Sequence, residues 1–250
     1  MNKKNNTNIP NPAQKMAIEH PPAPLMIIAG AGTGKTFTLE NRIIYLIQYY
    51  KIDPSEILAI TYTEKAAKEL KTRIIHQVGT KAQNMYVGTF HSFCYKIVND
   101  KNLDSNSNLI DESEMTHLLL DRYDDLGPFH SDIFSLDPKK SISDSFIPFF
   151  NRIRDELIDI DNIDLKQIDN LYDRDQELIN QLKDLIRIYP IVQKWKNQFN
   201  LIDYNDMIKS AYNHLTNNDS FLKDIQNQYK HIIIDEFQDN NFALNEISRL

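Results

Sequence analysis

Residues 25–44, LMIIAGAGTGKTFTLENRII, hold the pattern from which the fold of this chain can be predicted. The apolar run 25–29 predicts a buried strand, and the amphipathic pattern at the end of the stretch predicts a helix. Between them lie three of the six glycines in the chain, Gly30, Gly32 and Gly34. Glycine permits positive φ and close approach of backbone N–H groups to phosphate oxygens, and a helix N-terminus favours anions. The stretch therefore indicates a phosphate-binding loop.

The side chains after the loop would have defined roles at such a site. Lys35 would reach the β- and γ-phosphates of a nucleoside triphosphate, and the Thr36 hydroxyl would coordinate Mg²⁺. The strict motif has glycine where this chain has Ala29, and alanine is small enough to serve there. The alternative is a glycine-rich turn that binds nothing. The residues predicted to surround the nucleotide phosphates are Ala29, Gly30, Ala31, Gly32, Thr33, Gly34, Lys35 and Thr36.

A second polar cluster ends the apolar run in HIIIDEFQDNN, residues 231–241. Ligands of parallel sheets bind at the carboxyl ends of strands, where Asp235 would lie. A carboxylate there suits Mg²⁺, which proteins hold through one or two carboxylates. The next carboxylate, Glu236, could polarise a water molecule as general base, which favours hydrolysis over the transfer that a small-molecule kinase performs. The alternative is a pair of solvated acids at a strand end.

Short apolar runs alternate with helical patterns along the first third of the chain. Strands are predicted at 25–29, 57–63 and 85–90, each followed by a helical pattern, and again at 231–235. This alternation is typical of βαβ units and a parallel sheet. We therefore predict an α/β fold of the P-loop NTPase type, with helices on both faces of a parallel sheet.

Residues 109–198 differ in character, because they are acidic and helical in pattern. The segment 102–108 is predicted to be a loop, and 201–215 one more helix. The simplest account is one α/β domain interrupted by an all-helical insertion. The predicted bounds are 1–105 and 199–250 for the α/β domain and 106–198 for the insertion.

Composition limits the class of protein. Charged residues make up 25% and hydrophobic residues 41% of the chain, which is ordinary for a soluble globular protein. The single cysteine, Cys94, excludes a disulfide framework. Neither a secretory h-region nor a run of about 20 apolar residues is present. We expect a cytoplasmic protein without a membrane partner.

The net charge of −7 is unevenly distributed along the chain. Residues 1–105 carry 13 Lys+Arg and 8 Asp+Glu, whereas residues 106–250 carry 15 and 27. The total is atypical of a generic nucleic-acid binder, but a basic first third could present a positive local field. Ordinary surface variation is the alternative.

The motifs taken together resemble those of the UvrD/Rep/PcrA-like superfamily 1A DNA helicases. The similar segments follow the family's order and cover nearly the whole chain. They are NPAQKMAIEH (11–20, Q motif), AGAGTGKT (29–36, motif I), AITYTEKAAKELKTRI (59–74, motif Ia), VGTFHSFC (87–94, motif Ib), LIDYNDMI (201–208, before motif II) and IIIDEFQD (232–239, motif II). The resemblance implies a RecA-like domain 1A, with the insertion as subdomain 1B.

The resemblance also implies roles for single side chains. Gln14 would read the edge of adenine, and Gln238 would sense the γ-phosphate and act with Lys35 and Glu236 in catalysis. Tyr62 would contact or stack on single-stranded DNA, because ring–base stacking tolerates any sequence. The plain alternatives are an exposed helix glutamine, a strand tyrosine and, for the histidine of motif Ib, a packed side chain. The residues predicted to face DNA are Thr61, Tyr62, Thr89, Phe90 and His91.

Three residues depart from the family's pattern. Phe37 stands where arginine usually packs against adenine, so a ring could stack on the base but the cationic contact is lost. Asn240 stands where threonine is common. Glu64 stands where asparagine is usual, and it places a negative charge close to the proposed DNA path.

The resemblance implies an ATP-dependent DNA helicase that uses ATP and Mg²⁺, acts on single-stranded DNA and single-strand/duplex junctions, and moves 3′ to 5′. Family members continue into a second RecA-like domain, which supplies arginines to the γ-phosphate. We therefore expect an N-terminal fragment with very slow hydrolysis of its own. The alternatives are the motor of a helicase–nuclease and an ATP-dependent DNA-binding or defence protein without processive unwinding. The pathway and the oligomeric state stay open.

Overall fold

The computed structural model describes residues 9–100, 107–164, 168 and 175–250. The chain forms two compact units. The first, here called the sheet unit, comprises residues up to Ser92 together with Asp219–Asp239. The second, the helical unit, comprises Phe93–Asn218 together with Asn240–Leu250. Within the described residues, no helix has the length and apolar character needed to cross a membrane.

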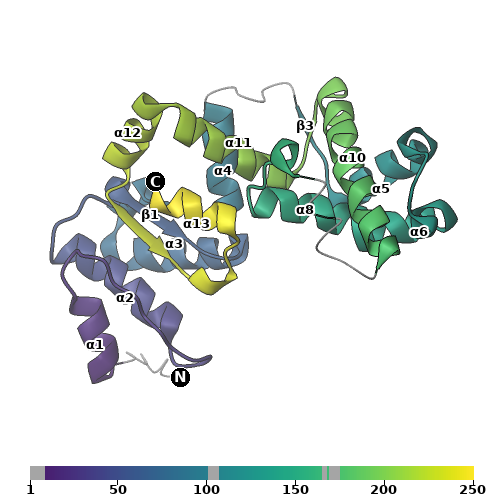
Figure 1. The fold of residues 1–250 in the computed structure, drawn as a ribbon. Helices are drawn as coiled ribbons and strands as arrows, with labels where there is room; N and C mark the ends of the chain where they lie inside the picture. Colours follow the sequence, from purple (N-terminus) through teal and green to yellow (C-terminus); the bar gives the residue numbers. More distant parts are fainter. Residues whose placement is uncertain (1–8, 101–106, 165–167, 169–174) are drawn as a thin grey trace, which may run out of the picture. The chain divides into compact units, whose positions relative to one another are not determined.

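A three-stranded parallel sheet forms the centre of the sheet unit (Figure 1). In spatial order its strands are β2 (Tyr86–Gly88), β1 (Ile57–Ile60) and β5 (His231–Ile234). Ile60 lies opposite Gly88 on one side and Ile234 on the other, so the carboxyl ends of the three strands meet at one edge. The prediction of an α/β fold with a parallel sheet is confirmed.

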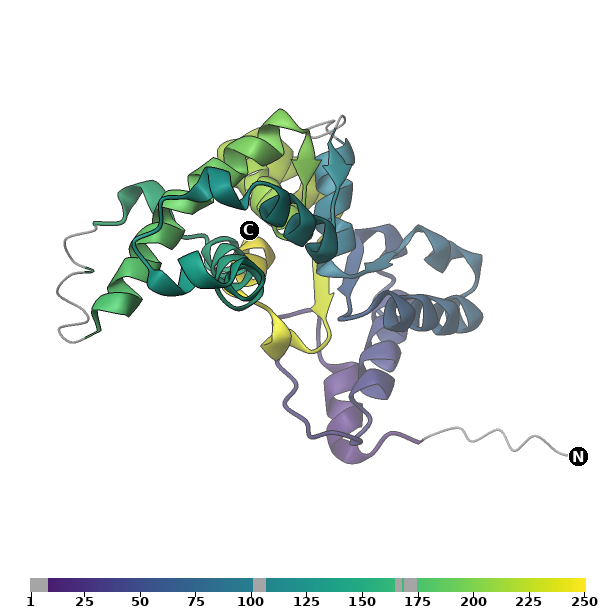
Figure 2. The same ribbon diagram turned by 90° about the vertical axis from the view of Figure 1, so that its right-hand side faces the viewer.

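The central strand β1 is buried on both of its faces. Ile57 and Ala59 pack against Ile43 of α2 (Lys35–Gln48) and Ile74 of α3 (Glu64–Val78). Side chains alternate between the faces of a strand, and the intervening residues of β1 are buried as well. Helix α1 (Pro12–Glu19) packs against α2 at the purple end of the ribbon (Figure 1, Figure 2).

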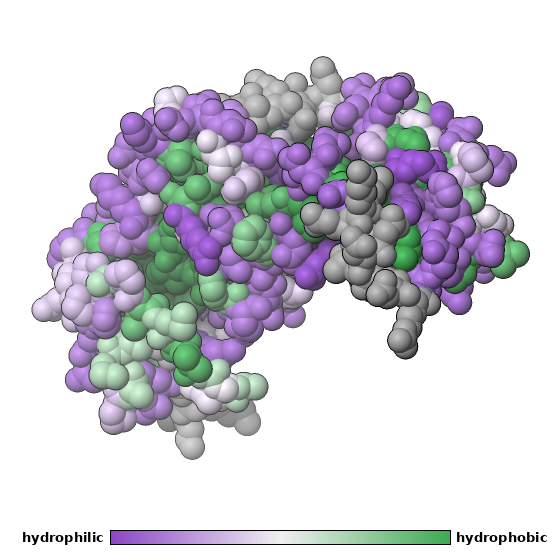
Figure 3. Space-filling view, viewed as in Figure 1, coloured by the Kyte–Doolittle hydropathy of each residue, from purple (hydrophilic) through white to green (hydrophobic). Residues whose placement is uncertain are grey.

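The predicted strand over residues 25–29 is wrong. These residues form no strand, and Met26 and Ile28 expose 76% and 90% of their surface. A strand requires a neighbour that pairs with its backbone, and an apolar run supplies side chains without supplying that neighbour. In the described residues β5 is one of the two edge strands of the sheet, and its Ile232 is 46% exposed. Figure 3 shows apolar side chains gathered on the surface of the sheet unit in the region of β5.

The helical unit is built around one aromatic and aliphatic core. Phe134, Phe146 and Phe150 are almost completely buried, and the ring of Tyr123 stacks on Phe146 with centroids 5.7 Å apart. The main helices of this unit are α4 (Phe90–Asp100), which begins in the sheet unit, α5 (Glu112–Asp121), α6 (Asp132–Leu136), α7 (Pro138–Ser141), α8 (Ile147–Asp155), α10 (Gln176–Gln198), α11 (Tyr204–Asn217) and α13 (Phe242–Arg249), whereas α12 (Asp219–Gln228) belongs to the sheet unit.

Two boundaries in the helical unit differ from the predictions. Asn108–Leu109, predicted as the end of a loop and the start of a helical region, form strand β3, which pairs in parallel with β4 (Leu201–Ile202). The helix predicted from residue 201 begins instead at Tyr204. Asp203 explains this start, because its carboxylate accepts hydrogen bonds from the N–H groups of the first turn and forms a capping box with Asp206. Of residues 102–108, only the last two lie within the described part.

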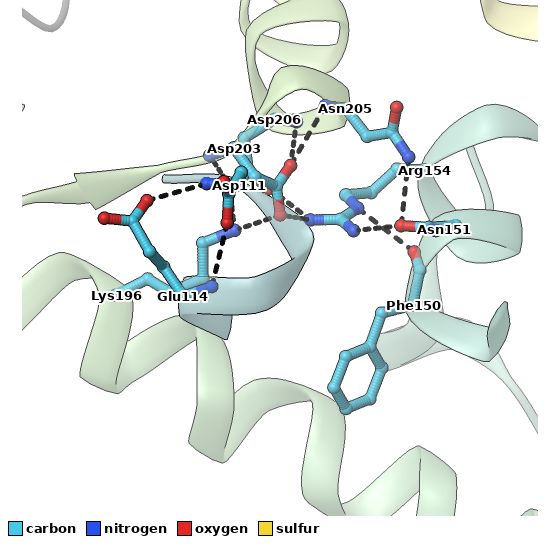
Figure 4. A network of polar contacts seen from close by, with 9 residues as sticks. All are labelled: Asp111, Glu114, Phe150, Asn151, Arg154, Lys196, Asp203, Asn205 and Asp206. Carbon is cyan, nitrogen blue, oxygen red and sulfur yellow. Dashed lines mark hydrogen bonds and ion pairs between the residues drawn. The ribbon is translucent and has the colours of Figure 1, made fainter. Parts of the chain in front are cut away.

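A buried network of charges joins three helices of this unit (Figure 4). Lys196 of α10 and Arg154 of α8 are 1% and 4% exposed. Both cations contact the carboxylates of Asp203 and Asp206 at the start of α11, with Arg154 Nη1 2.9 Å from Asp206 Oδ1 and Lys196 Nζ 2.7 Å from Asp203 Oδ2. Arg154 also donates to Asn151 Oδ1 over 2.8 Å. Two positive and two negative groups therefore compensate one another away from water.

The network keeps the Asp203 carboxylate ionised. Burial alone would raise the pKa of Asp203, but the charges of Arg154 and Lys196, with hydrogen bonds from Lys196 and the Asp206 backbone, lower that pKa overall. The buried charge is therefore retained and ties α11 to α8 and α10.

The two units divide the chain at residues 92/93, 218/219 and 239/240. The predicted domains divide it at 105/106 and 198/199. Both divisions place the acidic helices of 109–198 within one body. The prediction that 106–198 is an insertion stays a prediction.

Candidate nucleotide site and adjoining loops

The glycine-rich loop takes the backbone conformation that its glycines allow. Gly32 and Gly34 have φ of 73° and 88°, in the left-handed region that favours glycine. Gly34 is the N-cap of α2, so the N–H groups of the first turn open toward the loop. Thr33 Oγ1 donates to the Gly30 carbonyl over 2.7 Å and holds the loop from inside. The loop therefore presents backbone donors at a helix N-terminus, as an anion site requires.

Gln14 lies directly against this loop. Its Nε2 donates to the Thr33 carbonyl over 3.0 Å, and its Oε1 accepts from the Asn11 N–H over 2.9 Å in the capping box of α1. The side-chain amide thus bonds to a partner at each end. The structure brings Gln14 to the loop, and with these two bonds its amide still has one N–H and one oxygen lone pair for the edge of a base.

Gly34→Ala is expected to weaken binding of a fluorescent adenine nucleotide by at least about tenfold. A Cβ at this position would lie 2.8 Å from Gln14 Nε2, and φ of 88° is strained for any L side chain. The matched control is Gly79→Ala, where φ is 91° and no atom lies within 4 Å of the added Cβ. Both variants strain the backbone, but only the first touches the loop. Equal loss of binding in both variants would contradict the assignment of the loop.

Lys35 contacts a residue that lies 201 positions later in the chain. Its Nζ is 2.8 Å from Oε2 of Glu236, and the two side chains are 30% and 33% exposed. Gln238 Nε2 donates to the same carboxylate oxygen over 2.6 Å. The three residues predicted to be catalytic therefore lie together at the carboxyl end of β5.

The backbone at Glu236 is held in an unusual conformation. Its φ is 51°, which is uncommon for a residue other than glycine, and the turn is closed by the Asp239 N–H donating to the Glu236 carbonyl over 2.9 Å. Strained backbone of this kind is concentrated at functional sites. The turn directs the carboxylate toward Lys35.

Electrostatics distinguish the two neighbouring carboxylates. Hydrogen bonds from Lys35 and then Gln238 lower the pKa of Glu236. Burial, followed by the adjacent Glu236 charge, raises the pKa of Asp235. The pKa of Lys35 is raised in turn, first by its bond to Glu236. A cation close to Asp235 would lower the pKa of this carboxyl group by stabilising its ionised form. This agrees with the predicted role of Asp235 as a magnesium ligand.

The other residues predicted to contact nucleotide lie in the loop or the first turn of α2. Thr36 is exposed directly after Lys35. Phe37 is half-buried, and its carbonyl accepts from Asn41 Nδ2 over 2.8 Å within α2. Ala29 is half-buried, whereas Gly30, Ala31 and Gly32 are exposed at the surface of the loop.

The five residues predicted to face DNA follow the ends of β1 and β2: Thr61 and Tyr62 lie in the loop before α3, Thr89 connects β2 to α4, and Phe90 and His91 lie in the first turn of α4. Only two of them are exposed: Tyr62, at 70%, and His91. Thr61, Thr89 and Phe90 are buried, with 4%, 7% and 6% of their surface exposed. Of the five side chains, therefore, those of Tyr62 and His91 reach the surface, and the other three pack inside.

Sequence reasoning missed two contacts in these loops. Glu64 was recognised only as an added charge, yet its carboxylate accepts a hydrogen bond from Thr89 Oγ1 over 2.8 Å. Ser92 was not singled out, although its Oγ accepts from the Thr89 N–H over 2.8 Å and Thr89 Oγ1 accepts from the Ser92 N–H over 3.2 Å. The spacing Thr-x-x-Ser at the start of a helix is the signal that could have indicated this reciprocal cap.

Known proteins are similar to this chain over nearly its whole length. The family described as UvrD/REP helicase N-terminal domain matches residues 10–250. The chain is 32% identical over 238 residues to ATP-dependent DNA helicase UvrD1 of Mycobacterium tuberculosis, which covers 93% of this chain and 29% of that protein. It is 31% identical over 237 residues to ATP-dependent DNA helicase PcrA of Staphylococcus epidermidis, covering 93% and 30%. A probable DNA helicase II homolog of Mycoplasma genitalium is 32% identical over 248 residues, covering 96% and 33%.

The chain spans less than a third of the length of UvrD1 and PcrA. Within that span, the matched region contains the glycine-rich loop, Lys35, Glu236 and the two loops after β1 and β2. This chain belongs to the family of UvrD/REP helicase N-terminal domains.

Proposed function

We propose that these 250 residues are the ATP-binding part of an ATP-dependent DNA helicase that moves 3′ to 5′ on single-stranded DNA. The observation that carries the proposal is the contact between Lys35 and Glu236, 2.8 Å apart. This contact joins the glycine-rich loop to a carboxylate at the end of a parallel strand. The loop with Lys35 would hold a triphosphate, and the carboxylate of Glu236 would activate water. The proteins named UvrD1 and PcrA, which this chain is similar to, are ATP-dependent DNA helicases by name.

The proposed chemistry assigns one task to each side chain. Backbone N–H groups of the loop bind the phosphates, and Gln14 binds the adenine edge. Lys35 leaves Glu236 for the β- and γ-phosphates, so Glu236 loses the partner that lowers its pKa most and becomes the stronger base. Glu236 then accepts a proton from the attacking water, while Gln238, which bonds to Glu236, senses the γ-phosphate.

The residues present fit a magnesium ion. Thr36 and Asp235 would hold it, and the ion would neutralise charge on the phosphate oxygens. Among the described residues no three His, Cys, Asp or Glu side chains form a metal cage. Mg²⁺ takes most of its ligands from phosphate and water, so the oxygens of Thr36 and Asp235 would be a sufficient contribution from side chains.

The proposal places the other half of the ATP site in a second RecA-like domain, and 106–198 in subdomain 1B. Arginines of the second domain would contact the γ-phosphate, and their loss typically lowers turnover about 10³–10⁵-fold. The 250 residues alone should therefore bind nucleotide but hydrolyse it very slowly. Rapid DNA-stimulated hydrolysis by these residues alone would contradict this division of the site.

The function is tested in the whole protein that contains these residues. We expect ATP hydrolysis to rise on addition of a single-stranded oligonucleotide, and a duplex with a 3′ single-stranded tail to be unwound while one with a 5′ tail is not. Stimulated hydrolysis without unwinding would favour the DNA-binding or defence protein. Hydrolysis that does not respond to DNA would contradict the proposed function.

A further inference from the structure

The loops after β1 and β2 begin side by side in the sheet unit. The Thr61 N–H donates to the Gly88 carbonyl over 2.9 Å, which extends the ladder between the two strands by one bond. Beyond this point the chain enters α3 after residues 61–63 and enters α4 after Thr89. Backbone pairing therefore fixes the distance between the two segments only where they leave β1 and β2.

The bond between Thr89 and Glu64 connects the loops a second time. Thr89 Oγ1 donates to Glu64 Oε1 over 2.8 Å, and Glu64 is the first residue of α3. The same hydroxyl accepts from the Ser92 N–H in the first turn of α4, and it donates its single proton to the Glu64 carboxylate, which can only accept. The hydroxyl thus links the first turns of the two helices.

The first turn of α4 has little freedom to move away from β2. A Cβ added at Gly88 would lie 2.7 Å from Ser92 Oγ, and that Oγ donates to the Thr89 carbonyl over 2.9 Å. Thr89 is 7% exposed. A change at Glu64 therefore acts mainly on the loop at residues 61–63 and the start of α3.

We propose that Glu64 is a positioning residue for single-stranded nucleic acid, acting through its bond to Thr89 to hold the exposed Tyr62 and His91 at a fixed spacing. The inference rests on the proposed function, because it assumes that these two loops face the strand. Tyr62 stands between the Thr61 pairing and Glu64, so both ends of its loop are held. A held ring loses less freedom when a base stacks on it.

The proposal separates two properties of the Glu64 carboxylate. As a hydrogen-bond acceptor it positions the loops, whereas as a negative charge it repels phosphate. Glutamine keeps an acceptor oxygen and removes the charge. Alanine removes both.

The test measures binding of the 250-residue chain to a fluorescently labelled oligo-dT by anisotropy at two salt concentrations. We expect Glu64→Ala and Thr89→Val each to weaken binding about tenfold, in the range of one bond to a charged acceptor. Combining the two should cost no more than Thr89→Val alone, because the bond between Glu64 and Thr89 is already lost in that variant. Glu64→Gln and Thr89→Ser should bind at least as tightly as the unchanged chain.

Two controls keep the result interpretable. Glu69→Ala removes a charge from α3 without touching the loops, and nucleotide binding reports whether each variant is folded. If Glu64→Ala binds DNA as tightly as Glu64→Gln, or more tightly than the unchanged chain, the residue acts as a charge and the inference is overturned. If the unchanged chain binds nucleotide but no single strand, the proposed function fails, and the inference fails with it.

Discussion

Replacing Glu236 with glutamine is expected to lower ATP turnover of the whole protein by about 10²–10⁴-fold, the usual contribution of a positioned general base. Glutamine has the same shape and can still accept hydrogen bonds from Lys35 and Gln238, which lie 2.8 and 2.6 Å from the carboxylate. It cannot accept the proton of the attacking water. The loss should therefore appear in kcat, measured by steady-state phosphate release.

Nucleotide binding by the same variant should be unchanged or tighter. Lys35 is paired with the Glu236 carboxylate, and that pairing competes with the phosphates for the ammonium group. Removing the negative charge weakens the competitor. The control is Glu112→Gln, an exposed glutamate of the helical unit, for which neither value should change. Hydrolysis at a normal rate in Glu236→Gln would show that another group is the base.

Replacing Lys196 with methionine is expected to lower the free energy of unfolding of the helical unit by about 3–5 kcal/mol, the usual cost of removing one partner from a buried ion pair. Lys196 is 1% exposed and contacts both Asp203 and Asp206. Methionine fills a similar volume, so the main loss is electrostatic. Two carboxylates would then share the single charge of Arg154.

Trp195 provides the readout, because it is the only tryptophan in the chain and is buried in the helical unit. Its fluorescence during a urea titration should report the unfolding of the helical unit. The control is Lys194→Met, two residues away on the exposed side of α10, expected within about 0.5 kcal/mol of the unchanged chain. Adding Asp206→Asn to Lys196→Met should recover part of the loss, since it restores charge balance. A loss below about 1 kcal/mol for Lys196→Met would show that water reaches the network.

The agreement between sequence and structure is best where structure depends on near neighbours. The glycines at 32 and 34 take positive φ, and α2 starts at Lys35, because a glycine N-cap and the following periodicity are local properties. Strand β5 ends before Asp235 for the same reason, since the apolar run stops there. The conformation of the glycine-rich loop and the end of β5 therefore follow from short segments.

The disagreements concern partners. Residues 25–29 have the composition of a buried strand and are exposed, because pairing depends on which strand edge is available. Thr89 and Phe90 were predicted to face DNA and are buried, since a motif names residues without saying which side the neighbouring helices cover. Glu64 was read from its charge alone, and the hydroxyl that it accepts from lies 25 positions away.

By itself the sequence determined the parallel α/β class, the conformation of the glycine-rich loop and the acidic strand end, because φ preference, capping and hydrophobic period act over a few residues. Only the tertiary structure decided that Lys35 pairs with Glu236, that Asp203 and Asp206 hold two buried cations, and that Glu64 connects two loops. Each of these contacts depends on packing that brings distant segments within about 3 Å, the range of a hydrogen bond. A local pattern determines which groups a segment presents, and packing determines which groups they meet.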